Sequence, residues 1–197
     1  MERSLRTEGY AFICGADEAG RGPLAGPVCA AAVILPENCD LAGLDDSKRL
    51  TGKRREALYD RICEKAISYG IAFSSVEEIE SMNILNAALL AMDRAIAMLS
   101  PTPDLALIDG NTTRGIHVHA RGVVGGDGKC ACIAAASVLA KVTRDRLMVR
   151  LAEQYPQYGF EKHKGYGTKE HYAALEKYGP TPVHRMSFLK KFYAGRT

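Results

Sequence analysis

Two apolar runs separated by a glycine-rich segment constrain the fold of this chain most strongly. The runs cover residues 10–16 and 28–35, and both have the length and composition of buried β-strands. The segment between them contains Gly20, Gly22 and Gly26 together with two prolines, which favour a turn over regular structure. We therefore expect two neighbouring strands that pair antiparallel and are joined by a short loop.

Two acidic residues, Asp17 and Glu18, follow the first run at the point where the predicted strand ends. Carboxylates at a strand end can hold a hard divalent cation. The nearby Arg21 and the backbone N–H groups of the glycine-rich segment suit an anionic ligand, and glycine lets that ligand approach the backbone closely. Acids that can hold a metal, backbone N–H donors and an arginine in one place indicate phosphate chemistry.

Two further acids have the same setting, next to glycine at a predicted element boundary. Asp109 ends the apolar run 105–108 before Gly110, and Asp127 lies in the Gly-Gly-Asp-Gly segment 125–128. Together with Asp17 and Glu18 they make four carboxylates that could hold two Mg²⁺ or Mn²⁺ ions around a substrate phosphate. The alternative is that each acid only forms a turn or caps a helix, which suffices for an isolated Asp-Gly pair.

The rest of the chain alternates between strand and helix patterns. We expect strands at 67–76, 105–108 and 116–124, helices at 53–66, 77–99 (broken near 81–83), 130–151 and 168–178, and loops at 36–51 and 155–167. This order predicts an α/β fold with a five-stranded mixed sheet flanked by helices. No linker divides the 197 residues, so we expect a single domain over 1–197 with a helical C-terminal part from about residue 155.

The charge pattern is less informative than the acids. A net charge of +3 does not by itself indicate nucleic-acid binding. Basic and aromatic residues alternate in the last third, which fits a surface for a nucleic-acid backbone; the alternative, a solvated face over core aromatics, is favoured by composition alone. We also expect no membrane segment. Because no secretory signal precedes the six cysteines, we expect a reducing, cytoplasmic location.

Several motifs occur in order over nearly the whole chain. They are Asp-Glu-Ala-Gly-Arg-Gly-Pro at 17–23, Asp-Ser-Lys at 46–48, Asp-Gly at 109–110, Gly-Asp at 126–127, Ala-Ala-Ala-Ser at 134–137, His-Lys-Gly-Tyr-Gly-Thr at 163–168, and His-Arg with Ser-Phe at 184–188. In this order they resemble the bacterial ribonuclease HII family, a type 2 ribonuclease H. Cys132 departs from the resemblance, because the family usually has serine there and a thiol is a weaker hydrogen-bond partner.

The resemblance implies a ribonuclease H-like fold and a metal-dependent endonuclease that uses Mn²⁺ or Mg²⁺ in a two-metal mechanism. Its substrate would be RNA in an RNA–DNA hybrid or a single ribonucleotide embedded in duplex DNA. Cleavage would fall on the 5′ side of the ribonucleotide and leave a 3′-OH and a 5′-phosphate. The sequence shows no sign of an obligate protein partner, and we expect a monomer.

The resemblance also assigns roles to single residues of this chain. The family's metal-binding and catalytic carboxylates map onto Asp17, Glu18, Asp109 and Asp127. The substrate-binding positions are Gly20, Arg21 and Gly22 for the ribose 2′-OH, Tyr166 for the deoxyribose after the ribonucleotide, and Lys48 for a phosphate. Without the resemblance, Tyr166 would be interpreted as a core or turn aromatic.

Two other classes of protein compete with this interpretation. Another nuclease or a transposase of the same fold would share the carboxylates without distinguishing ribose from deoxyribose. A non-catalytic nucleic-acid-binding module would keep the basic residues without needing the acids. Four carboxylates near a phosphodiester repel it unless a metal is present, which favours an enzyme.

Overall fold

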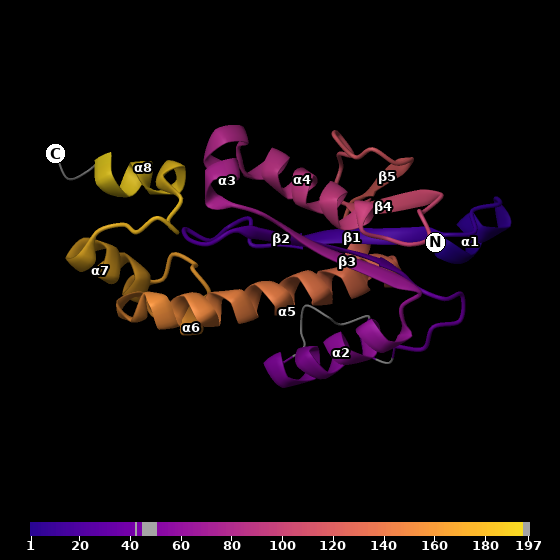
Figure 1. Cartoon of the computed structure of the whole chain (residues 1–197), viewed down its shortest axis with the longest axis horizontal. Helices are drawn as coiled ribbons and strands as arrows, with labels where there is room; N and C mark the ends of the chain where they lie inside the picture. Colours follow the sequence, from indigo (N-terminus) through magenta and orange to yellow (C-terminus); the bar gives the residue numbers. More distant parts are fainter. Residues whose placement is uncertain (42, 45–50, 195–197) are drawn as a thin grey trace.

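A five-stranded mixed sheet forms the centre of the computed structural model, which describes residues 1–41, 43–44 and 51–194 (Figure 1). The strand order is β3-β2-β1-β4-β5. Strands β1 (Ile13–Ala19), β2 (Val28–Ile34) and β3 (Ser68–Ser74) pair antiparallel. Strand β4 (Leu105–Asp109) runs parallel to β1, and β5 (Ala120–Val123) runs parallel to β4.

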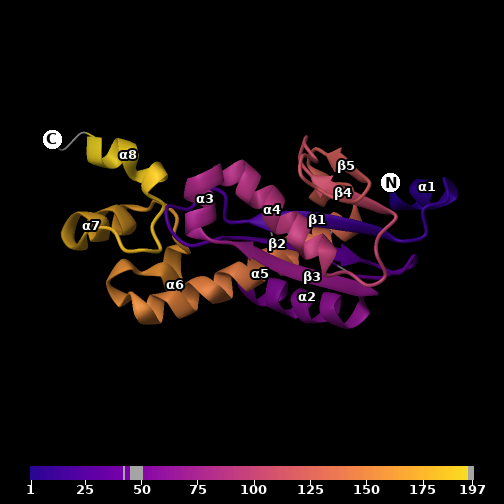
Figure 2. The same cartoon turned by 45° about the horizontal axis from the view of Figure 1, so that its top comes forward.

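Helices cover both faces of this sheet, as the turned view shows (Figure 2). On one face α3 (Val76–Met82) and α4 (Ile84–Ala97) pack on alternate strand residues such as Ala30 and Ala32. On the other face α2 (Gly52–Lys65) and α5 (Ala131–Gln154) pack on Ala31 and Val33. Every residue of β2 is therefore buried, which explains why its sequence is continuously apolar.

The remaining helices gather at the two ends of the molecule (Figure 1). Helix α1 (Glu2–Thr7) lies at one end. At the other end α6 (Phe160–His163), α7 (Lys169–Tyr178) and α8 (Met186–Ala194) share a separate core with the end of α5. Tyr158 and Phe160 are buried in that core, so the core interpretation of the alternating basic and aromatic pattern is confirmed for these two aromatics.

Several expectations from the sequence are confirmed. The first two strands pair antiparallel, and the helix expected at 53–66 is α2, at whose start Thr51 accepts a hydrogen bond from the Arg54 N–H. The helical stretch after β3 is broken at Asn83, which has a φ of 71° and caps α4 through its side chain.

Other expectations are wrong in their boundaries. The first strand does not end at residue 16, because its pairing with β2 continues to Ala19 and places Asp17 and Glu18 inside the strand. The fifth strand is shorter than 116–124, because it pairs with only four residues of β4. The expected loop 155–167 contains the 3₁₀ turn η3 (Pro156–Tyr158) and α6, which the buried Phe160 anchors.

Gly15 in β1 provides a test of the close packing between the sheet and α5. A Cβ added there would lie 2.2 Å from the Ile133 nitrogen and 2.3 Å from the Cys132 carbonyl carbon. We expect Gly15→Ala to lower the free energy of unfolding by about 1–3 kcal/mol, because backbone atoms must shift.

Gly52→Ala is the matched control, since nothing lies within 4 Å of a Cβ at that helical position. It should leave the stability unchanged or raise it by up to about 1 kcal/mol. Urea denaturation of the two variants measures the difference, and equal midpoints would contradict the packing described here.

Candidate active site

The parallel pairing of β1 with β4 brings two of the predicted acids to the same end of the sheet. Their register pairs Ala16 with Ile108, so Asp17 and Asp109 are the next residues on neighbouring strands. Alternate strand residues face opposite sides. Gly15 approaches α5, so Asp17 faces α5 as well, whereas Glu18 lines a cavity on the α4 side.

Asp17 is buried, with an exposed fraction of 6%, and one of its oxygens accepts a hydrogen bond of 2.7 Å from the Glu18 N–H. Burial, together with the neighbouring charges of Glu18 and Asp109, raises the pKa of Asp17 to about 8. Burial also raises the pKa of Glu18, while its ion pair with Arg21, at 3.3 Å, acts in the opposite direction. Three carboxyl groups thus lie close enough to repel one another.

The fourth acid reaches the same region through a glycine turn. The Gly126 N–H donates to an Asp109 carboxylate oxygen at 2.7 Å, which holds the 3₁₀ turn η2 (Gly126–Gly128) against the end of β4. Asp127 is the next residue and is buried in that turn. All four acids therefore lie around the ends of β1 and β4, as the sequence predicts.

The chemistry of these donors fits a hard divalent metal. All four are carboxylates, and a cation would relieve the repulsion that raises the pKa of Asp17. Among residues 1–41, 43–44 and 51–194, no three Asp, Glu, His or Cys side chains already form a group that could hold a metal ion. An ion such as Mg²⁺ usually keeps several non-protein ligands, so water or a substrate phosphate would complete its coordination.

A cavity of about 390 Å³ lies beside the acids, and Gly20–Arg21–Gly22, the segment predicted to contact the ribose 2′-OH, forms part of its wall. It is lined by Glu18, Ala19, Gly20, Arg21, Gly22, Arg55, Ser137, Val138, Lys141 and Tyr166. A Cβ added to Gly22 would lie 3.5 Å from a Tyr166 ring carbon, so these two distant parts of the chain meet here. Tyr166 is 45% exposed, which makes the core alternative wrong, whereas its N–H donates to the His163 carbonyl oxygen across a turn, in agreement with the turn alternative.

A smaller cavity of about 140 Å³ lies on the other side of the Glu18–Arg21 ion pair. Asp109 and Gly110 line it together with residues of α4. Both cavities therefore share Glu18 and Arg21, which connect the acids with the predicted substrate-binding segment. Lys48 lies outside the described residues.

Sequence reasoning missed two buried arginines that hold this segment in place. Arg185 donates to the Gly20, Arg21 and Gly26 carbonyl oxygens at 2.7, 3.0 and 2.9 Å. Arg144 donates to the Ala25, Pro27 and Lys164 carbonyl oxygens at 3.0, 3.0 and 3.1 Å. Burial lowers the pKa of Arg185 to about 9, so its guanidinium remains charged at neutral pH.

Gly20 must be glycine in this arrangement. Its φ is +102°, and an added Cβ would lie 2.0 Å from the Arg144 Nε. The sequence contains a signal that Arg144 is buried, because it is the one charged residue in a row of buried α5 positions four residues apart, namely 136, 140, 144, 148 and 152. Arg185 lies in a motif of the resemblance, but no local pattern predicts what it contacts.

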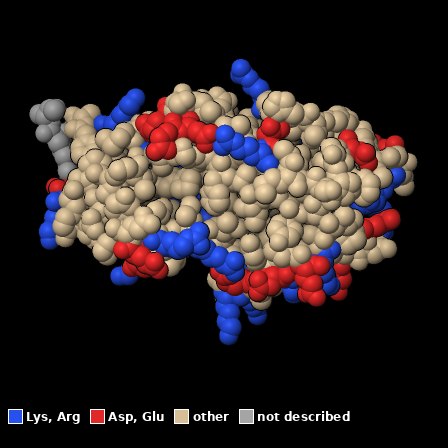
Figure 3. Space-filling model, viewed as in Figure 1, with Lys and Arg blue, Asp and Glu red and all other residues tan. Residues whose placement is uncertain are grey.

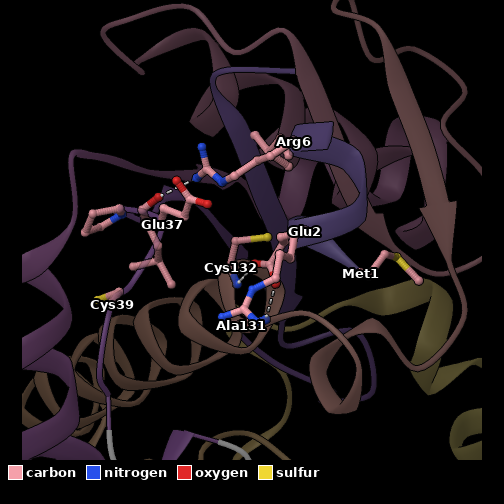
Figure 4. Close-up of a pocket in the computed structure, with 11 residues that line it drawn as sticks. Met1, Glu2, Arg6, Glu37, Cys39, Ala131 and Cys132 are labelled. Atoms are coloured by element: carbon pink, nitrogen blue, oxygen red, sulfur yellow. Dashed lines mark hydrogen bonds between the residues drawn. The ribbon is translucent and has the colours of Figure 1, made fainter. Parts of the chain in front are cut away.

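A third cavity, of about 200 Å³, lies where the N-terminal segment meets the start of α5 (Figure 4). The Glu2 carboxylate accepts hydrogen bonds from the Ala131 and Cys132 N–H groups at 3.2 and 2.8 Å, and so caps α5. The Cys132 thiol is buried, and burial, Glu2 and Cys130 raise its pKa. Cys132 therefore belongs to this cap.

The surface shows both signs of charge. In Figure 3 a band of Lys and Arg side chains lies over α5 and α6, next to acidic side chains over α2. Acidic side chains also gather above the band, so the visible face carries no extended surface of one sign. No helix in the described part of the chain is long and apolar enough to cross a membrane.

Comparison with known proteins identifies relatives of this chain. The family described as Ribonuclease HII matches residues 14–191. The ribonuclease HII of Bacillus licheniformis is 54% identical over 188 residues, which cover 95% of this chain and 73% of that protein.

Solved structures are similar as well. The ribonuclease H2 of Pyrococcus horikoshii OT3 matches with a TM-score of 0.76 and 24% identity, over 93% of this chain and 98% of that one. The Bst-RNase HIII in complex with Mn²⁺ matches with a TM-score of 0.71 and 16% identity, over 93% of this chain and 69% of that one. The predicted ribonuclease H-like fold is thereby confirmed.

The arginine contacts lead to a test of stability. Arg185→Gln removes the guanidinium and leaves buried carbonyls of the 20–26 segment without donors, so we expect it to lower the free energy of unfolding by about 2–4 kcal/mol. Chemical denaturation measures the loss.

Arg146→Gln is the matched control, because Arg146 is 43% exposed and pairs with Glu56 at the surface. Its loss should cost less than about 1 kcal/mol. A similar cost for both variants would show that the buried carbonyl contacts do not stabilise the fold.

Proposed function

The chain belongs to the ribonuclease HII family and is an endoribonuclease. We propose that it cuts the RNA of RNA–DNA hybrids and also cuts duplex DNA at single embedded ribonucleotides. We place the cut on the 5′ side of the ribonucleotide, leaving a 3′-OH and a 5′-phosphate. The observation that carries this proposal is the cavity in which Glu18, the Gly20–Arg21–Gly22 segment and Tyr166 meet beside Asp17 and Asp109.

The orientation of the Gly20–Arg21–Gly22 segment supports its role in reading the ribose. Arg185 binds the Gly20 and Arg21 carbonyl oxygens from the buried side. In a planar trans peptide the next N–H points opposite to the carbonyl, so the Arg21 and Gly22 N–H groups point away from Arg185. These residues line the cavity, and we propose that their N–H groups donate to a ribose 2′-OH, which DNA lacks.

Tyr166 supports preference for a junction between RNA and DNA. Its ring lies against Gly22 at the cavity and is partly exposed, so it can contact the sugar next to the recognised ribose. A hydroxyl on that sugar would crowd the ring, whereas deoxyribose leaves room for it. Lys48 remains a proposed phosphate contact on the same substrate.

Asp17, Glu18, Asp109 and Asp127 would hold Mg²⁺ or Mn²⁺. The donor chemistry supports this, and a related ribonuclease HIII structure is described as a complex with Mn²⁺. Bound ions of this kind supply Lewis-acid activation of water and stabilise the leaving oxygen of a phosphodiester. The side chains themselves position these groups, and no side chain acts as a nucleophile. Action as a monomer and a cytoplasmic location belong to the same proposal.

Asp17→Asn tests the role of the acids. We expect cleavage of a ribonucleotide-containing duplex to fall at least about 100-fold, because several kcal/mol of charge stabilisation are lost. The fold should persist, since Asn has nearly the same size as Asp and carries no charge that burial would disfavour. Cleavage rates and denaturation midpoints are both measured.

Glu153→Gln is the control, because Glu153 is an exposed residue near the opposite end of α5 from Asp127. It should cleave at the wild-type rate. Turnover by Asp17→Asn within about twofold of wild type would remove Asp17 from the active site, since the loss expected for a metal ligand is far larger.

A further inference from the structure

Two buried histidines, His171 and His184, form a hydrogen-bonded chain that ends at the backbone of Tyr166. Their exposed fractions are 0% and 2%. The Nε2 atoms of the two rings lie 3.1 Å apart, and the His171 Nδ1 lies 2.9 Å from the Tyr166 carbonyl oxygen. Neither histidine lines the cavities of the proposed active site.

The partners of this chain fix which nitrogen carries each proton. A carbonyl oxygen only accepts, so the His171 Nδ1 is protonated and donates to Tyr166. The Nε2 of the neutral His171 ring must then accept, so the His184 Nε2 donates to it. That leaves the His184 Nδ1 as an acceptor, which agrees with its contact of 2.9 Å to the Thr181 N–H.

Both rings are neutral at pH 7 in this environment. Burial and the neighbouring His171 lower the pKa of His184 to about 4. Burial also lowers the pKa of His171, and the ring of His163 stacks on it with centroids 4.6 Å apart. With neutral rings, the Tyr166 carbonyl and the His184 Nε2 donor both favour the tautomer in which the His171 Nδ1 carries the proton.

The residue after His184 connects this chain with the other side of the cavity. The Arg185 guanidinium donates to the Gly20 and Arg21 carbonyl oxygens, and the Arg185 backbone N–H donates to the Leu24 carbonyl oxygen at 2.8 Å. His184 forms an antiparallel bridge with Ala25. One dipeptide of the C-terminal part therefore contacts both the segment proposed to read the ribose and, through His171, the backbone of Tyr166.

We propose that His171 and His184 are positioning residues that set the place of Tyr166 and thereby the preference of the enzyme for RNA–DNA junctions. This inference rests on the proposed function of Tyr166. The side chain of Tyr166 is 45% exposed, so packing constrains it weakly and its backbone position decides where the ring lies. Without the donor from His184, the His171 proton can move to Nε2, and the bond to the Tyr166 carbonyl is then lost.

Two substitutions of His184 separate this role from a purely structural one. The amide nitrogen of His184→Gln lies near the Nε2 position and keeps the donor to His171. The amide of His184→Asn lies near the Nδ1 position and keeps the contact with Thr181, but it loses the donor to His171. A role limited to holding the 181–184 turn predicts that Asn is the better replacement.

The readout is the ratio of two values of kcat/KM, one for a single ribonucleotide in duplex DNA and one for a uniform RNA–DNA hybrid. We expect His184→Asn to lower this ratio about fivefold, as for loss of one hydrogen bond of about 1 kcal/mol. His184→Gln should stay within about twofold of wild type, because the donor to His171 remains. The reverse order of the two variants would overturn the proposal.

A double substitution tests whether the effect passes through Tyr166. In a Tyr166→Ala background, His184→Asn should cause no further change in the ratio. An additional loss of similar size in that background would overturn the proposal, because the histidines would then act on another group.

A second pair of variants covers the case in which His184→Asn does not fold, which denaturation midpoints reveal. His171→Asn keeps a donor near the Nδ1 position and should keep the ratio, whereas His171→Leu should lower it. Equal ratios for these two folded variants would overturn the proposal.

The Tyr166→Ala variant separates a failure of the proposed role of Tyr166 from a failure of the inference about the two histidines. If Tyr166→Ala leaves the ratio at the wild-type value, the junction role of Tyr166 and this inference fail together. If Tyr166→Ala lowers the ratio and folded His184→Asn does not, only the inference from the histidines is overturned.

Discussion

The arrangement of the candidate active site depends on two buried guanidinium groups that bind backbone carbonyls. Arg144 and Arg185 each donate to three carbonyl oxygens, most of them in the loop between β1 and β2. A loop rich in glycine and proline has little regular structure to satisfy its own polar groups, and buried carbonyls without donors would be costly. The arginines meet this need, and at Gly20 and Arg21 the peptide geometry leaves the Arg21 and Gly22 N–H groups pointing away from Arg185.

The acids on β1 illustrate the opposite electrostatic situation. Burial and like charges raise the pKa of Asp17, so the protein holds carboxyl groups where the fold alone disfavours their charged form. The two kinds of buried charge act on adjacent parts of the chain, since the loop held by Arg185 begins directly after β1. The strand fixes the acids relative to the sheet, and the arginines fix the loop relative to the strand. Under the proposed function, a substrate that bridges both parts would be bound with its sugar and its phosphate in a defined relation.

Sequence reasoning predicted the parts of the molecule that depend on local pattern. The strands, their antiparallel start, the break at Asn83 and the grouping of the acids at strand ends all follow from periodicity and from glycine next to acid. The predicted end of β1 was wrong, because pairing with β2 determines where the strand ends. The contacts of Arg185 and the His171–His184 pair could not be predicted, because they join residues that only the folded chain brings together.

Mapping the cut in a labelled DNA duplex that contains one ribonucleotide tests the central claim most directly. The experiment compares this duplex with an all-DNA control in Mg²⁺, in Mn²⁺ and in EDTA. The account predicts a metal-dependent nick on the 5′ side of the ribonucleotide, with the control intact. Cleavage of both duplexes would contradict ribose recognition by the loop that Arg185 holds, and absence of cleavage in either metal would contradict the assignment of the carboxylates.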